Sequence, residues 1–330
     1  MTIDVAEIKK RLSAVLKDPV KVREYIRQYG PVIDAKNIAE LNQEMARRSR
    51  RREEKGEEGQ DPIFSISLTC PVCSQSEVVG YELHAKSQAV SQNKFLVPVY
   101  RGTSGYRTVD YTLLSVAVCH RCLFASPDKK DFSRPATNKA NEVKSQLGSN
   151  TIITLQERIG ERKRIVNGIT NYRAYFERPR IDQAVLDSYR LAITRAKAET
   201  WHELPYSYFK LGSYLLRIAK ILKDMEKNTS ETLQSALTYF EESFKRSECP
   251  SEEVEIQVMY LIVALSAKLG EHKKAKIYTS AFKSLYVNNK EREKKPAAEN
   301  AAAPGLIALW KDKIEFVRDS LDDPAYFKDE

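Results

Sequence analysis

Two kinds of hydrophobic periodicity divide this chain into a β-rich part and a helical part. Between residues 61 and 135, apolar and polar residues alternate over 64–68 and again over 79–85. Successive side chains of a strand point to opposite faces, so this period of two predicts β-strands. A third alternating stretch, 95–99, is followed by a glycine-bearing loop and a run rich in β-forming residues over 106–118, which predicts a hairpin. We therefore expect a small antiparallel sheet in this part of the chain.

The period changes to that of helices beyond residue 181. Proline, glycine and Thr-Ser breaks separate five runs, 182–203, 206–227, 231–247, 251–269 and 271–286. The segment 258–265 is apolar on every face, which predicts a helix buried at the centre of the stack. Leu269-Gly270 followed by Ala275 resembles the turn within a tetratricopeptide repeat, where glycine permits the turn and alanine a close helix crossing. The predicted fold class is α+β, a small antiparallel β module followed by a tetratricopeptide-like superhelix.

Composition and charge suggest how the rest of the chain is organised. Residues 288–304 are rich in Lys, Glu and then Ala, as in a linker. Apolar residues recur at helical spacing beyond it, and this last helix either packs on the repeats or docks on a partner. The predicted segments are N-terminal helices with a charged linker (1–60), the β module (61–135), a basic helical connector (136–181), helical repeats (182–287), a linker (288–304) and a C-terminal helix (305–330).

Four of the five cysteines form two Cys-x-x-Cys pairs, Cys70 with Cys73 and Cys119 with Cys122. This spacing lets both sulfurs of a pair face one ion, and four thiolates suit zinc in a closed, structural site of the zinc-ribbon or rubredoxin type. The pairs are 45 residues apart, whereas zinc ribbons usually have gaps of roughly 15–20 residues. The strands between the pairs must therefore fold back to close the site. Iron, which uses the same ligands, and a redox dithiol are the alternatives to zinc.

The cysteine pairs and their surroundings resemble a bacterial family of unknown function over roughly residues 65–290. The shared features are Cys-Pro-x-Cys at 70–73, a long β insert, and Cys-x-x-Cys at 119–122 followed by Phe-Ala and Asp-Phe steps. The resemblance implies zinc at the four cysteines and helical repeats behind them, but no known activity. Family members often have glycine directly after a Cys-x-x-Cys turn, which we call a knuckle, where this chain has Ser74 and Leu123. A positive φ is less favourable for these two residues, which puts the turn geometry in question.

The connector contains a candidate nucleic-acid surface. Residues 157–180 include seven basic and three acidic residues, with aromatic residues interleaved. Basic and stacking side chains together are typical of proteins that bind single strands. The alternative is a helical segment whose aromatic residues pack inward while its charges face water. The candidate contacts are Arg158, Arg162, Lys163, Arg164 and Arg173.

These features favour an adaptor over an enzyme. The 330 residues carry a net charge of +9, which permits acidic partners without requiring them. The sequence shows no phosphate-binding loop, no nucleophile elbow and no His–carboxylate motif. With no apolar run near the ~20 residues of a membrane span, and no export signal, we expect a cytoplasmic protein.

The leading hypothesis is a non-enzymatic scaffold that holds a protein partner in the groove of its helices, where helix position makes Tyr214 and Tyr239 candidate contacts. A zinc-dependent nucleic-acid-binding regulator and a thiol redox or iron protein are the alternatives. The sequence does not indicate an oligomeric state.

Overall fold

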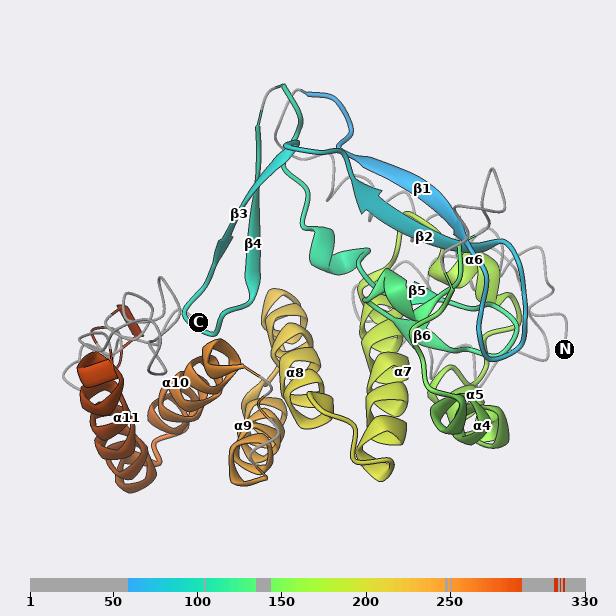
Figure 1. Cartoon of the computed structure of the whole chain (residues 1–330). Coiled ribbons are helices and arrows are strands. Elements are labelled where there is room, and N and C mark those ends of the chain that lie inside the picture. Colours follow the sequence, from blue (N-terminus) through green and yellow to red (C-terminus); the bar gives the residue numbers. More distant parts are fainter. Residues whose placement is uncertain are drawn as a thin grey trace, which may run out of the picture.

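The computed structural model describes residues 59–103, 105–134, 144–246, 249 and 251–292, together with 312, 313, 315 and 317. The predicted N-terminal helices fall outside these residues. Figure 1 shows a set of short strands followed by a row of helices. The strands are β1 (Ile63–Leu68), β2 (Val78–Leu83), β3 (Gln88–Gln92), β4 (Pro98–Gly102), β5 (Ala117–Val118) and β6 (Ala125–Ser126), and two 3-10 turns are η2 (Tyr111–Leu113) and η3 (Lys129–Asp131). The helices are α4 (Ser149–Glu157), α5 (Ile159–Ile165), α6 (Tyr172–Phe176), α7 (Asp182–Trp201), α8 (Ser207–Asp224), α9 (Ser230–Lys245), α10 (Glu252–Lys268) and α11 (His272–Arg292).

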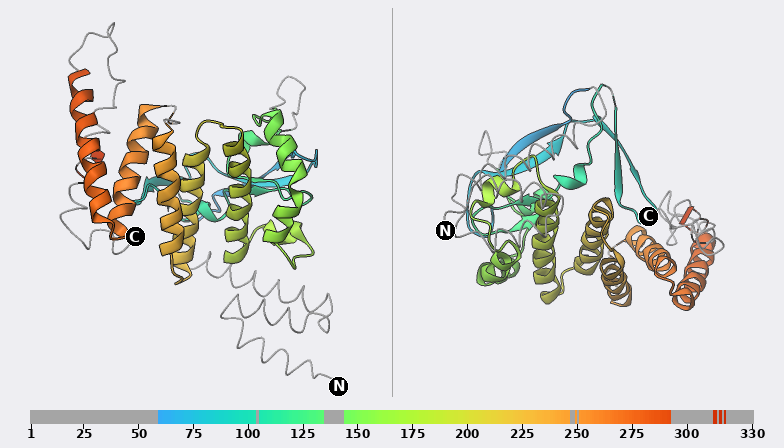
Figure 2. Two further views of the ribbon diagram at one scale, coloured as in Figure 1. Left: turned by 90° about the horizontal axis from the view of Figure 1, so that it is seen from below. Right: turned by 180° about the vertical axis from the view of Figure 1, so that it is seen from behind.

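The strands form three separate antiparallel hairpins instead of the single small sheet that the sequence predicted. β1 and β2 lie where the alternation of apolar residues predicted strands, and they pair from Ile63 opposite Leu83 to Leu68 opposite Val78. β3 pairs with β4, and β5 pairs with β6 over two residues on each strand. The hairpins lie on one side of the row of helices (Figure 2).

The predicted hairpin of 95–99 with 106–118 is wrong. Residues 93–97 are the turn between β3 and β4, because the Asn93 side chain accepts hydrogen bonds from the N–H groups of Phe95 and Val97, at 3.0 and 2.9 Å. Most of 106–118 is not a strand, since the Asp110 carboxylate accepts from the Thr112 N–H and caps η2. In both places a side chain that bonds the local backbone outcompetes the β-propensity of its neighbours.

The five helices α7 to α11 follow the predicted runs to within about three residues at every end except the C-terminal end of α11, which continues into the predicted linker. Successive helices pack side by side (Figure 1). At Gly212 of α8 an added Cβ would lie 2.7 Å from the Phe240 ring of α9, so the glycine permits this close contact. α10 is buried all round from Val258 to Ser266, as its apolar sequence predicted. In the described part of the chain, none of the helices is both long and apolar enough to cross a bilayer.

Two hydrophobic clusters join the β1–β2 and β5–β6 hairpins to the helices. One contains Leu123 and Ala125 from the β part with Leu186 and Tyr189 of α7 and Ile218 of α8. The other surrounds the cysteines and includes Leu155 of α4 and Ala198 of α7. The cysteine-bearing part and the helices therefore share buried apolar surface across the domain boundary predicted at residue 135.

Part of the C-terminal segment packs on this same chain. Val317 is buried in the cluster formed by α8 to α11, and the Lys313 ammonium lies 5.3 Å from the centre of the Tyr260 ring on α10. Apart from Asp312 and Glu315, the other residues of the predicted C-terminal helix lie outside the described residues. Where it is described, this segment contacts the helices in cis.

Candidate metal centre

The two cysteine pairs occupy equivalent turns, each at the closed end of a hairpin. In the first, the Ser74 N–H donates to the Cys70 carbonyl at 2.9 Å, and the Cys70 N–H donates to the Gln75 carbonyl at 2.9 Å. In the second, Leu123 and Cys119 repeat the first of these bonds at 2.9 Å, and the Cys119 N–H donates to the Phe124 carbonyl at 2.8 Å. β1 leads into one knuckle and β5 into the other, so the pairing of the strands positions both pairs of sulfurs.

Both knuckles use the left-handed backbone conformation without glycine. Ser74 has φ 58° and Leu123 has φ 60°. The turn geometry that the absence of glycine had put in question is therefore present at both positions. Such a φ is unfavourable for a residue with a side chain. For Leu123, burial of the side chain among apolar residues of α7 and α8 opposes that cost.

The four cysteine sulfurs gather at one point. All four Sγ atoms lie within 4.8 Å of one another. Sγ of Cys70 is 3.6 Å from that of Cys122, and Sγ of Cys73 is 3.6 Å from that of Cys119. Three of the residues are buried and Cys73 is half-buried. The two 3.6 Å separations match four thiolates around one ion, because zinc–sulfur distances of about 2.3 Å place tetrahedral sulfurs under 4 Å apart.

The cysteines of this cluster act strongly on one another's ionisation. Hydrogen bonds from the Cys122 and Cys70 thiols lower the pKa of Cys119, and the backbone N–H groups of Cys122 and Arg121 act in the same direction. The hydrogen bonds with Cys119 and Cys122 raise the pKa of Cys70, and burial adds to this effect. A first thiolate is thus favoured at Cys119, while a second one close by is opposed by the charge of the first.

A buried arginine lies against this cluster. Arg162 of α5 is only 1% exposed, and its Nε donates to the Cys122 carbonyl at 2.9 Å. Both terminal nitrogens are buried without a hydrogen-bond partner among the described residues. Burial lowers the pKa of Arg162, and the nearby Cys122, Cys70 and Cys119 raise it. A buried guanidinium needs a negative charge, and four thiolates around a divalent ion would supply one, with a net charge of −2. The residues present therefore fit a metal held by thiolates.

The structure separates the five candidate nucleic-acid contacts. The prediction that Arg162 contacts nucleic acid is wrong, because its side chain lies in the interior beside the cysteines, where a phosphate cannot reach it. Arg158 and Arg173 are exposed, and each pairs with a glutamate, Arg158 with Glu161 at 2.8 Å and Arg173 with Glu177 at 2.8 Å. Lys163 and Arg164 are exposed on α5.

The aromatic residues of the connector pack inward. Phe176 is buried, and the Tyr175 hydroxyl donates to Asp187 of α7 at 2.8 Å. The five basic residues thus do not form one surface with stacking aromatic rings.

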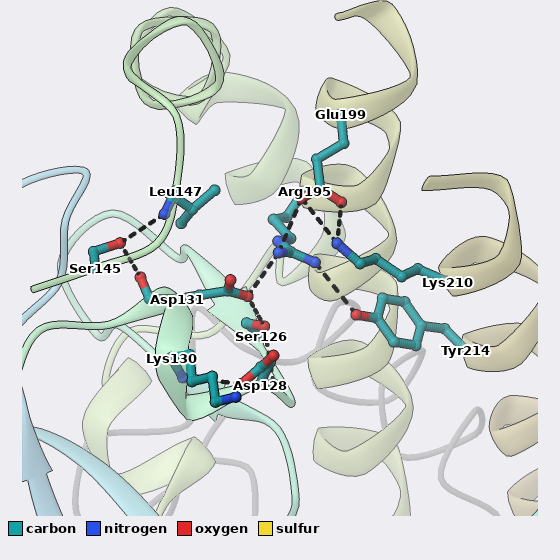
Figure 3. A network of polar contacts seen from close by, with 10 residues as sticks. All are labelled: Ser126, Asp128, Lys130, Asp131, Ser145, Leu147, Arg195, Glu199, Lys210 and Tyr214. Carbon is teal, nitrogen blue, oxygen red and sulfur yellow. Dashed lines mark hydrogen bonds and ion pairs between the residues drawn. The ribbon is translucent and has the colours of Figure 1, made fainter. Parts of the chain in front are cut away.

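A second group of polar residues, which sequence reasoning missed, connects the metal-site region to the helices (Figure 3). Arg195 of α7 is 3% exposed and contacts the carboxylates of Asp131 at 2.8 Å and Glu199 at 3.0 Å. Lys210 of α8 pairs with Glu199 at 3.0 Å, and the Ser126 hydroxyl donates to Asp131. Burial raises the pKa of Asp131, and the contacts with Arg195 and Ser126 oppose this increase. Asp131 follows the second knuckle by nine residues, so this network links that knuckle to α7 and α8.

The family model for an uncharacterized protein conserved in bacteria (DUF2225) matches residues 63–303. The chain belongs to this family. The matched range contains both knuckles, Arg162, the Arg195 network and all of the helices α4 to α11. No curated protein and no solved structure matches the chain. Membership confirms the resemblance that the cysteine motifs suggested, and in this member the four cysteine sulfurs gather across the long insert.

Proposed function

We propose that this DUF2225 protein is a non-enzymatic cytoplasmic adaptor, in which one structural zinc ion holds the hairpins against a protein-binding array of helices. The observation that carries the proposal is the closed group of four cysteine sulfurs. Four thiolates fill a tetrahedral zinc ion and leave no position for a substrate, so the metal supplies rigidity. Thiolate ligands of this kind persist in a reducing compartment, which favours the cytoplasm.

The helices support the second half of the proposal. We infer a tetratricopeptide-like array from three features at the positions that such repeats use. Gly212 allows the Phe240 ring to approach α8, Gly270 takes φ 78° in the turn between α10 and α11, and Ala275 is fully buried. Stacked helix pairs of this kind generate extended surfaces that bind protein segments. Tyr214 offers little surface to a partner, since it is 5% exposed.

Metal analysis and partner capture test this function. Protein purified from a bacterial host without added metal should contain one zinc per chain by elemental analysis. Affinity purification should recover a partner with the wild-type chain and lose it with Cys119→Ser, because the hairpins are then no longer held to the helices. A native protein without zinc or iron would contradict the metal centre, and unchanged partner recovery by the cysteine variant would contradict its part in the adaptor.

Replacing Arg162 by methionine should weaken zinc binding by about 10- to 100-fold, the range found when groups that support metal ligands are removed. The methionine fills similar space but leaves the charge of the thiolates uncompensated. The stability of the metal-free protein should fall much less than the zinc affinity, because the variant also removes a buried guanidinium whose two terminal nitrogens have no hydrogen-bond partner among the described residues. Competition with a chromogenic chelator measures the affinity.

The matched control is Lys163→Met, which removes an exposed charge from the next position of α5. This control should bind zinc like the wild type. Equal zinc affinities for Arg162→Met and Lys163→Met would show that the buried charge does not act on the metal centre.

A further inference from the structure

The turn between β3 and β4 inserts into the helical array. Phe95 and Val97 are 5% and 3% exposed and belong to the same hydrophobic cluster as Leu216 of α8, Leu233 of α9 and Leu261 of α10. The Tyr260 hydroxyl of α10 donates to the Lys94 carbonyl at 2.7 Å. Figure 1 shows the hairpin extending from the end of β2 to the ends of α8 and α10. We call residues 93–97 the tip, and the surface of α8, α9 and α10 around it the groove.

The conformation of the tip is fixed by hydrogen bonds within it, whereas the strands β3 and β4 that carry it, which we call the stem, are exposed. Two N–H groups bonded to the Asn93 side chain, a Leu96 φ of 58° and the bond from the Asn93 N–H to the Val97 carbonyl at 3.0 Å fix its conformation. In contrast, Val90 of β3 and Val99 of β4 are 59% and 41% exposed. A two-stranded ribbon exposed in this way has little stability of its own. The Gln88 side chain bonds the base of this hairpin to Arg107 and Val109, and the position of its far end depends on the contacts of the tip.

The groove is larger than the tip that occupies it. Hollows of about 180 and 320 Å³ lie on its two sides, and Phe95 and Val97 line both of them. The larger one has the size of a small ligand site. Both run along α8, which contributes Lys220 and Lys223 to one and Lys210 and Arg217 to the other, against a single lining carboxylate, Asp224. Lys210 and Lys220 also pair with Glu199 and Asp110.

We propose that the groove binds an acidic protein segment with an aromatic anchor, and that the tip occupies the anchor position in cis until such a segment displaces it. Phe95 shows what the groove accepts as an anchor. Lys210 and Lys220 are already paired, but Arg217 beside the larger hollow favours a carboxylate on a flanking residue. A ligand that must compete with the tip binds with an affinity reduced by the fraction of molecules in which the groove is open. The proposal deepens the adaptor function and rests on it.

Peptide binding by two matched full-length variants tests this. Phe95→Ser with Val97→Ser removes the two buried apolar side chains of the tip, and Val90→Ser with Val99→Ser changes only the exposed stem. The labelled probes are a cyclised peptide of residues 91–99 and the same peptide with Lys94→Glu. The tip variant should bind either probe at least tenfold more tightly than the stem variant or the wild type. The acidic probe should bind better, and its advantage should shrink with added salt.

Three results would overturn the proposal. The first is a tip variant that keeps its helical circular dichroism but binds neither probe, since the tip would then be a permanent part of the core. The second is equal binding of the two probes, which would remove the preference for acidic segments. The third is dimerisation of the wild type through exchanged hairpins, which would make a second copy the occupant.

A measurement on the wild type covers the case in which the tip variant does not fold. Saturating acidic probe should speed hydrogen exchange of the tip amides, and unchanged exchange would contradict displacement. A failure of this proposal can be distinguished from a failure of the adaptor function. Probe binding without any captured partner would contradict the adaptor alone, whereas partner capture without probe binding would contradict the groove as its site.

Discussion

Replacing Cys119 by serine should abolish zinc binding and unfold the cysteine-bearing hairpins. Zinc contributes on the order of 10–16 kcal/mol of apparent binding free energy in small zinc-folded peptides, which is comparable to the whole free energy of unfolding of a typical domain, about 5–15 kcal/mol. Cys119 is fully buried and its sulfur is 3.6 Å from that of Cys73. A serine hydroxyl at this position neither provides a thiolate ligand nor matches the size of the cysteine sulfur. Elemental analysis and thermal unfolding followed by far-UV circular dichroism measure both effects.

The same change should also lower the melting temperature of the helices. The sequence alone predicts that the helical part keeps its own core and survives loss of the metal. In the structure, Leu123 and Ala125, which directly follow the second knuckle, pack against α7 and α8. Unfolding the knuckle removes this buried surface from the helices too. We therefore expect one shifted transition for the whole described region instead of a helical part that melts as in the wild type.

Cys249→Ser is the matched control for this experiment. Cys249 is a half-buried thiol whose sulfur lies 3.9 Å from the Ser243 hydroxyl oxygen, packed against the cluster of α8 to α11 and apart from the metal centre. This variant should keep its zinc and lose little stability. Zinc retained at wild-type stoichiometry in Cys119→Ser would contradict the four-cysteine site.

The elements that sequence reasoning located share a strong local signal. The helices α7 to α10 carry repeated apolar positions, and each ends within about five residues before a break that the sequence shows, at Pro205, Thr229, Pro250 and Gly270. The cysteines are recognisable because two pairs at ligand spacing are typical of metal sites and unusual elsewhere. Each of these signals lies within a few residues, so one sequence is enough to show it.

The features that were missed depend on residues far apart in the chain. Phe95 and Val97 alternate with polar residues as a strand would, but Asn93 ahead of them and the groove 120 residues later make them a turn that inserts into the helices. Arg162 belongs to a run of three basic residues that looks solvent-exposed in the sequence. Only the packing of α5 against the second knuckle places Arg162 in the interior. Asn93 was the available signal, because Asn side chains often organise turns.

Replacing Arg195 by methionine should destabilise the protein by about 3–5 kcal/mol, the usual cost of removing one partner from a buried ion pair. The variant leaves the Asp131 carboxylate buried beside Ser126, while Glu199 keeps Lys210. Lys245→Met is the control, since this lysine is 60% exposed and pairs with Glu242 at 3.3 Å. Exposed pairs contribute about 0–1 kcal/mol. Urea unfolding at neutral pH compares the two variants.

The pH dependence of the Arg195→Met deficit identifies Asp131 as its source. Burial already raises the pKa of Asp131 in the folded protein, and loss of Arg195 should raise it further. A carboxyl whose folded pKa lies above its unfolded value favours folding below the unfolded pKa, and this contribution is lost as the pH rises through the folded pKa. The stability deficit should therefore shrink as the pH falls toward the ordinary range of aspartate, and adding Asp131→Asn should reproduce that recovery at neutral pH. A deficit that is independent of pH and unaffected by Asp131→Asn would assign the loss to the packing of Arg195 instead of to its charge.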